Sequence, residues 1–182
     1  MNFVRNLLVN ILDIVKVVII SAAIIIPIRT FVFQPFFVRG TSMEPSFYNG
    51  DYLIIDELSY RVREPQRGEV VVFRPPGNDT QFYIKRIIGL PGEKVTIDKG
   101  TVSVFTEGNE IVLKEPYISK DVIDGNKQII AGPGEYILLG DNRGHSSDSR
   151  VFGPVPTKNF VGKVFITAWP ITDFALFAAP VY

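Results

Sequence analysis

A serine and a lysine that together could carry out acyl transfer stand in two short segments of the chain. Ser42 lies in Gly40-Thr41-Ser42-Met43-Glu44-Pro45, and Lys85 lies in Tyr83-Ile84-Lys85-Arg86-Ile87-Ile88-Gly89-Leu90-Pro91-Gly92. A serine hydroxyl becomes an effective nucleophile when a neighbouring base removes its proton, and a neutral lysine amine can be that base. The two segments therefore raise the hypothesis of a Ser–Lys pair.

Taken alone, Ser42 also has a purely structural interpretation. Gly40 before it and Pro45 after it are typical of a turn. The segment is not a Gly-x-Ser-x-Gly nucleophile elbow, because Glu44 stands where the second glycine is required. By itself, this segment predicts a turn more strongly than a nucleophile.

Lys85 and Arg86 are adjacent cations in a predicted strand. Successive strand residues point to opposite faces, so one of the two cations can face water while the other lies among apolar side chains. A buried Lys85 would have a lowered pKa and could act as a base near neutral pH. The opposite arrangement, with Lys85 exposed and Arg86 lying along the core, agrees with the sequence about equally well.

A third segment, Gly140 to Arg150, contains no aliphatic side chain and could brace a neighbouring site. Its charged residues are Asp141, Arg143, Asp148 and Arg150. A solvated loop is the simpler interpretation of this composition. His145 and Asp148 do not by themselves predict a catalytic triad.

Composition excludes several classes of site. The 182 residues include no cysteine and one histidine, which removes thiol chemistry and leaves no basis for a His-rich metal site. Lys+Arg and Asp+Glu are 19 each, so no net charge points to a nucleic-acid partner. We expect neither a metal nor a cofactor.

From about residue 39 to residue 182, short apolar runs alternate with turn residues, which predicts an all-β domain. Its coiled antiparallel sheets are expected to be barrel-like, and no amphipathic helix is predicted in it. The predicted strands are Tyr52–Ile55, Glu69–Phe73, Phe82–Ile88, Lys94–Ile97, Val102–Phe105, Ile111–Leu113, Tyr136–Leu139 and Val161–Thr167.

Residues 1–38 have a different character and predict one N-terminal transmembrane helix. The uncharged stretch from Val17 to Ile28 is shorter than the roughly 20 residues that a crossing needs, but Ile11 to Phe33 is long enough if Lys16 and Arg29 snorkel outward. A cleaved secretory signal is the alternative, and an uncleaved anchor fits the continuing apolar run better. The basic residues on the two sides of the helix do not decide its orientation.

In this order, the segments resemble the conserved boxes of the bacterial type I signal peptidases, which remove signal peptides from exported preproteins. The resemblance covers nearly the whole chain. Its boxes are the anchor, Arg29-Thr30-Phe31-Val32-Phe33-Gln34-Pro35-Phe36, Ser42-Met43-Glu44-Pro45, Arg67-Gly68-Glu69-Val70-Val71-Val72-Phe73, Lys85-Arg86-Ile87-Ile88-Gly89-Leu90-Pro91-Gly92, Gly140-Asp141-Asn142-Arg143 and Asp148-Ser149-Arg150. An ordered series of motifs is far more specific than any one of them.

The resemblance implies a role for each matching residue. Ser42 would attack the scissile carbonyl, Lys85 would take its proton, and Ser146 would orient Lys85. The bracing network would consist of Asp141, Arg143, Asp148 and Arg150. The backbone N–H of Ser42 would stabilise the oxyanion. Gly40, which stands where some members of the family carry a serine donor, would offer its own N–H as a second donor. Met43, Phe82 and Ile84 would form walls of the substrate pockets.

The resemblance also implies the partners and the location. The substrate would be a preprotein with small residues at the first and third positions before the cut, bound as an added strand. The chain would cross the cell membrane once and contact lipid, with the catalytic domain on the extracytoplasmic side. The sequence indicates no oligomeric state. A self-cleaving protease of the LexA type and a non-catalytic membrane-tethered β module are the rival interpretations.

Overall fold

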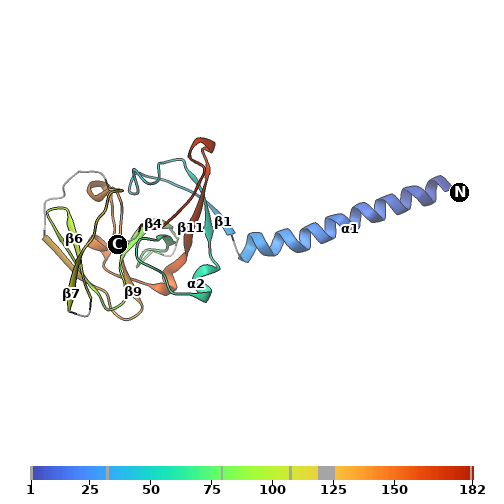
Figure 1. Cartoon of the computed structure of the whole chain (residues 1–182). Helices are drawn as coiled ribbons and strands as arrows, with labels where there is room; N and C mark the ends of the chain where they lie inside the picture. The colour runs from blue at the N-terminus through green and yellow to red at the C-terminus, as the bar shows by residue number, and fades with distance from the viewer. Residues whose placement is uncertain (1, 32, 79, 107, 119–125, 181) are drawn as a thin grey trace.

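A long N-terminal helix leads into a domain built of β-strands (Figure 1). The computed structural model describes residues 2–31, 33–78, 80–106, 108–118, 126–180 and 182, and only the backbone of 2–9, 27–31 and 33. The helix, α1 (Asn2–Phe31), projects away from the domain, and the N-terminus lies at its far end (Figure 1).

The described side chains of α1 are mostly apolar and mostly exposed to solvent. Ile14, Val17 and Ile26, for example, are 64%, 63% and 61% exposed. Asp13 and Lys16 form an exposed ion pair on the same helix. Within the described part of the chain, no helix meets both the length and the apolarity required to span a bilayer.

Two antiparallel sheets form the domain, which confirms the predicted all-β class. The larger sheet contains β1 (Phe33–Phe37), β2 (Tyr52–Asp56), β3 (Val70–Phe73), β4 (Tyr83–Gly89), β9 (Glu135–Leu139), β10 (Val155–Pro156), β11 (Phe160–Trp169) and β12 (Ala175–Leu176). Its order is β1-β2-β11-β3-β4-β9-β10, with β12 on β11. Two register shifts between β11 and β2 bend the long strand and curl the sheet.

The smaller sheet has the order β7-β6-β5-β8. Its strands are β5 (Lys94–Asp98), β6 (Thr101–Thr106), β7 (Asn109–Val112) and β8 (Asn126–Ile130). Helical structure in the rest of the domain is limited to α2 (Ser59–Val62), α3 (Ser149–Phe152), η1 (Arg143–His145), η2 (Thr157–Asn159) and η3 (Ile171–Asp173). Each helical segment is about one turn long and covers little of either sheet.

The buried core consists of clusters that connect the sheets to the loops. One cluster joins Ile88 of β4 and Leu139 of β9 to Val95 and Val104 of the smaller sheet. Because this second sheet packs over β4 and β9, the centre of the larger sheet is buried on both faces. A second cluster, which includes Met43 and Phe47, fixes the loop after β1 to the larger sheet.

Each strand predicted from the sequence is present, with ends that differ by a residue or two. The strands β1, β8, β10 and β12 were not predicted. β1 lies within residues 1–38, the segment assigned to the anchor, and pairs along its whole length with β2. Its residues therefore belong to the larger sheet, and the division of the chain at residue 38 stays a prediction.

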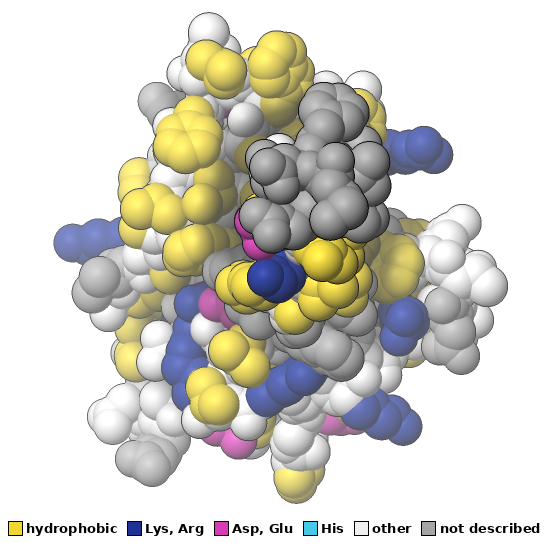
Figure 2. Space-filling view, turned by 90° about the vertical axis from the view of Figure 1, so that its right-hand side faces the viewer, with side chains coloured by type: hydrophobic (Ala, Val, Ile, Leu, Met, Phe, Trp, Pro, Cys, Tyr) yellow, Lys and Arg dark blue, Asp and Glu magenta, His cyan; other side chains and the backbone are white. Residues whose placement is uncertain are grey.

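Hydrophobic side chains gather on the face of the domain from which α1 leaves (Figure 2). Four apolar side chains at the end of β11 and in the residues that follow it are strongly exposed, with Trp169 at 59%, Ile171 at 73%, Phe174 at 62% and Leu176 at 66%. An exposed apolar surface of this kind is typical of a contact with a partner or a lipid surface.

Candidate active site

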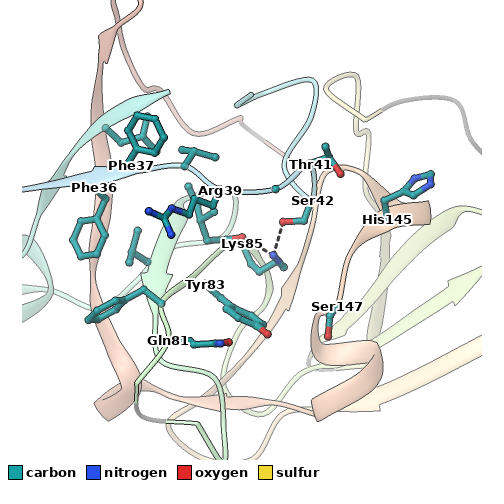
Figure 3. A pocket seen from close by; sticks show the side chains of 16 residues that line it. Phe36, Phe37, Arg39, Thr41, Ser42, Gln81, Tyr83, Lys85, His145 and Ser147 are labelled. Carbon is teal, nitrogen blue, oxygen red and sulfur yellow. Dashed lines mark hydrogen bonds between the residues drawn. The ribbon is translucent and has the colours of Figure 1, made fainter. Parts of the chain in front are cut away.

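Ser42 lies in a tight turn that the hydrophobic core fixes in place. The Glu44 N–H donates to the Thr41 carbonyl and the Phe47 N–H donates to the Met43 carbonyl. Met43 and Phe47 are 1% and 2% exposed, so both ends of this turn are anchored. The half-buried Ser42 side chain is left facing a pocket (Figure 3).

Two asparagines hold the backbone around Ser42. The Asn142 N–H donates to the Ser42 carbonyl at 3.1 Å, and Asn142 Nδ2 donates to the Thr41 carbonyl at 3.1 Å. On the other side, Asn49 Oδ1 accepts from the Gly40 N–H at 3.0 Å. The nucleophile segment is therefore held from within its own loop by Asn49 and from the loop after β9 by Asn142.

Lys85 reaches Ser42 directly from β4. Its Nζ atom lies 2.7 Å from Ser42 Oγ and also donates to the Ile84 carbonyl at 2.8 Å (Figure 3). The lysine is only 3% exposed. The structure thus brings together the two residues that sequence analysis paired.

Burial lowers the pKa of Lys85 from its ordinary value of 10.5 to about 8. The nearby charges partly cancel, since Asp148 and Asp141 raise this pKa and Arg150 lowers it. A lysine with a pKa near 8 is partly neutral at physiological pH and can accept a proton from a hydroxyl group.

Arg86 is also buried, at 2% exposed, on the opposite face of β4. Its guanidinium forms a two-point ion pair with Asp141, with distances of 2.8 Å and 2.6 Å. It also donates to the Gly68 carbonyl at 2.9 Å and lies 4.0 Å from the centre of the Tyr117 ring. The expectation that one of the two adjacent cations faces water is therefore wrong, because Asp141 and the rings of Tyr117 and Phe177 enclose the Arg86 guanidinium.

Asp148 and Arg150 form the second ion pair of the polar segment. The Arg150 guanidinium contacts both carboxylate oxygens of Asp148, at 2.8 Å and 2.7 Å. The Gly140 N–H donates to the same carboxylate at 3.0 Å. Burial by itself would raise the pKa of Asp148, but these hydrogen bonds and the Arg150 charge hold it below its ordinary value.

Arg143 completes the network from η1. Its Nε atom donates to the Gly140 carbonyl at 3.0 Å, and its guanidinium pairs with the buried carboxylate of Glu115. The charged residues of the segment from Gly140 to Arg150 thus all form ion pairs, although Gly144, His145 and Ser147 in the same segment are exposed. This arrangement is a geometric basis for the predicted bracing role.

Gly140 allows the polar segment to approach the nucleophile closely. A Cβ atom there would lie 2.2 Å from Ser146 Oγ and 2.5 Å from the Ser42 carbonyl oxygen, so no other residue fits without movement. Ser146 Oγ is buried and has no hydrogen-bond partner among the described residues. It therefore makes no hydrogen bond to Lys85 in this structure, and its role as the orienting residue stays a prediction.

The two predicted oxyanion donors differ in their surroundings. The Gly40 N–H is engaged by Asn49. The Ser42 N–H donates no backbone hydrogen bond within the described segments. Of these two N–H groups, that of Ser42 is the one available to an incoming substrate. The contribution of the Gly40 N–H to the oxyanion hole stays a prediction.

A pocket of about 740 Å³ opens beside the Ser–Lys pair. Phe82 and Ile84 line it, as predicted for substrate-pocket walls, whereas Met43 packs in the core beneath Ser42 and is not part of the lining. The remaining lining residues include Phe36, Phe37, Val38, Arg39, Leu53, Val72, Gln81, Tyr83, His145 and Ser147. No group of three or more metal-binding side chains occurs in the described part of the chain.

Sequence reasoning missed the positioning roles of Asn49, Asn142 and Gly140. Asn142 lies inside a segment that was singled out, but a side chain that holds a distant backbone has no local signature. Asn49 precedes Gly50, and an Asn-Gly pair is typical of a turn rather than of a contact with Gly40. These roles depend on contacts that become visible only in the folded chain.

Comparisons with known proteins agree with this geometry. The family model for signal peptidase, peptidase S26, matches residues 11–169. A probable signal peptidase I-2 from Synechocystis sp. is 38% identical over 170 residues, covering 91% of this chain and 76% of the relative. Signal peptidase IB from Staphylococcus aureus is 31% identical over 173 residues, covering 85% of this chain and 87% of the relative.

A solved structure is also similar. A signal peptidase I from Enterococcus faecalis V583 is 31% identical, with a TM-score of 0.48, covering 56% of this chain and 97% of that one. The match of the family model to residues 11–169 includes part of α1 and the pocket with its Ser–Lys pair. The chain belongs to the signal peptidase family, peptidase S26.

Proposed function

We propose that this chain is a membrane-bound serine endopeptidase that cleaves N-terminal signal peptides from preproteins, with Ser42 as nucleophile and Lys85 as general base. The observation that carries the proposal is the 2.7 Å contact between the buried Lys85 amine and Ser42 Oγ. It favours an enzyme over a catalytically silent β module. Membership in peptidase S26 favours signal peptide cleavage over LexA-type self-cleavage.

The reaction is an acyl transfer in two halves. Neutral Lys85 takes the Ser42 proton while Oγ attacks the scissile carbonyl, and the developing oxyanion is stabilised by the Ser42 N–H. Collapse of this intermediate breaks the peptide bond, and the leaving amine takes the proton from Lys85. Water, activated by Lys85, then hydrolyses the acyl-enzyme and releases Ser42.

The substrate would bind as a strand along the edge of β4. β9 pairs with β4 only from Arg86 onward, so Tyr83, Ile84 and Lys85 have no neighbouring strand on that side within the described sheet. This free edge lines the pocket beside Ser42. Backbone pairing there would hold the preprotein, and the apolar walls would select small side chains by shape.

α1 would anchor the enzyme in the membrane, with the β domain on the extracytoplasmic side. Its apolar side chains between Ile11 and Ile26 are exposed rather than packed on the domain, and lipid would cover them. The exposed apolar residues Trp169, Ile171, Phe174 and Leu176 would contact the same membrane.

The experiment that tests this function uses the full chain in detergent with a preprotein that carries alanine at the first and third positions before the cut. We expect one cut, directly after the first-position alanine. Replacing that alanine by tyrosine should lower kcat/KM by at least about 100-fold, because the proposed selection for small residues at this position excludes an aromatic ring. Mass spectrometry of the released mature protein locates the cut.

A tyrosine three positions after the cut provides the matched control and should have a much smaller effect. The proposed function fails if the preprotein stays intact. It also fails if cleavage does not depend on side-chain size at the first position.

The activity should follow the protonation of Lys85. Because only the neutral amine is a base, log kcat/KM should rise with unit slope at low pH and level off above about pH 8. About a tenth of the amine is neutral at pH 7, and about nine tenths at pH 9. Initial rates of peptide cleavage from pH 6 to pH 10.5, with circular dichroism at each pH, measure this dependence. A flat profile, or a midpoint near 10.5, would contradict the assignment of Lys85 as the base.

A further inference from the structure

Arg39 places a cation at the wall of the pocket beside Ser42. It lies in the extended segment between β1 and the nucleophile turn, and its exposed side chain lines the pocket with Phe36 and Phe82 (Figure 3). Neither the acyl-transfer mechanism nor the selection of small residues uses this charge.

The pocket is electrostatically one-sided although the chain as a whole carries no net charge. Among the described residues, its lining includes Arg39, Lys85 and His145 and no carboxylate. Arg74 adds a further positive charge at the wall, 5.1 Å from the centre of the Phe82 ring. Since Lys85 must be neutral to act, Arg39 is the permanent charge within the pocket.

Arg39 differs from the other arginines near the site in having no protein partner. Arg86, Arg143 and Arg150 each form a close ion pair with a carboxylate. Among the described residues, Arg39 takes part in no ion pair or hydrogen bond through its side chain. All N–H donors of its guanidinium are therefore available for a ligand. A carboxylate fits them best, because its two oxygens can accept two parallel hydrogen bonds from the planar guanidinium.

The position of Arg39 limits which part of a substrate it can meet. Arg39 precedes Ser42 by three residues, and three extended residues span at most about 11 Å. The substrate carbonyl must lie at Ser42 Oγ. A guanidinium on this segment therefore reaches substrate side chains within about three residues of the cut.

We propose that Arg39 is a specificity-determining residue that binds an aspartate or glutamate side chain of the preprotein within three residues of the cut. The proposal rests on the proposed function and adds a charge preference to the selection by size. Acidic residues at that position favour cleavage, and basic residues there disfavour it. Because the pair is partly exposed, salt weakens the preference.

The test is a set of peptides that carry aspartate or asparagine in turn at each position from three before to three after the cut. For the unmodified chain in neutral detergent, one position should give an aspartate-to-asparagine ratio of kcat/KM of about threefold to tenfold. In Arg39→Gln the ratio should fall to about one, and in Arg39→Glu it should reverse. Arg61→Gln, which removes an exposed arginine from α2 outside the pocket, should keep the ratio of the unmodified chain.

The outcomes separate this proposal from the proposed function and from a lipid role for Arg39. Cleavage of the asparagine peptides with an Asp/Asn ratio of one at every position overturns the specificity proposal and leaves the peptidase assignment standing. Failure to cleave any peptide overturns the peptidase assignment itself. A loss in Arg39→Gln that appears only in vesicles with anionic lipid, with the peptide ratios unchanged, assigns Arg39 to a headgroup and overturns the proposal.

Discussion

Replacing Ser42 with alanine or Lys85 with methionine is expected to lower kcat/KM for preprotein cleavage at least about a thousandfold, with the fold retained. Ser42→Ala removes the atom that forms the acyl-enzyme. Lys85→Met keeps the length and apolar stem of a side chain that is 3% exposed, but removes the only base within 2.7 Å of Ser42 Oγ among the described residues. If preprotein cleavage is followed for several hours, a rate that is a thousandfold lower can still be measured.

The effects of the two substitutions on kcat/KM should not add. Because each needs the other, the double variant Ser42→Ala/Lys85→Met should be no slower than the slower single variant. Ser59→Ala on α2 and Lys158→Met in η2 remove the same groups outside the pocket and should cleave at the unmodified rate. If either single variant cuts as fast as the unmodified chain, the Ser–Lys mechanism is wrong.

Much of the fold could be predicted because most strands carry a local signal. Phe82–Ile88, for example, was predicted and is β4 (Tyr83–Gly89) in the structure. β1 (Phe33–Phe37) was missed because its apolar residues continue the run of α1 and because Pro35 is unusual in a strand. β8 (Asn126–Ile130) is mostly polar and exposed, so it offers no alternation to detect.

The site was predictable to a lesser degree. Alternation along β4 correctly separates the faces of Lys85 and Arg86, but exposure depends on what covers each face. Lys85 is buried beside Ser42 on one face, and Arg86 is buried against Asp141 and the Tyr117 ring on the other. Asn49 and Asn142 could not be found from the sequence, because a side chain that holds a backbone group elsewhere in the chain leaves no local pattern.

Removing the Asp141 carboxylate is expected to cost about 3–5 kcal/mol of folding free energy. Asp141 and Arg86 are 0% and 2% exposed and form a two-point ion pair. Asp141→Ala leaves the Arg86 charge buried among the Gly68 carbonyl and the Tyr117 ring with no carboxylate to balance it. Denaturant unfolding of the full chain in detergent, followed by tryptophan fluorescence or circular dichroism, measures the change.

A double-mutant cycle shows whether the unbalanced charge is the cause. In an Arg86→Met background, Asp141→Ala should cost far less, since no cation is left without its partner. Asp98→Ala, which removes an exposed carboxylate at the end of β5, should change stability by less than about 0.5 kcal/mol. An equal cost of Asp141→Ala with and without Arg86 would show that the ion pair is not what stabilises this region.

The same substitution should also affect catalysis, since Asp141 directly precedes Asn142. The Asn142 N–H and side chain donate hydrogen bonds to the carbonyls of Ser42 and Thr41. If the backbone shifts at position 141 in the variant, these bonds weaken and the turn that orients Ser42 loosens. We expect kcat of Asp141→Ala to fall while KM changes little, when both are measured at a temperature where the variant is still folded. An unchanged kcat in folded Asp141→Ala would restrict the Arg86–Asp141 pair to stability and separate it from the alignment of Ser42.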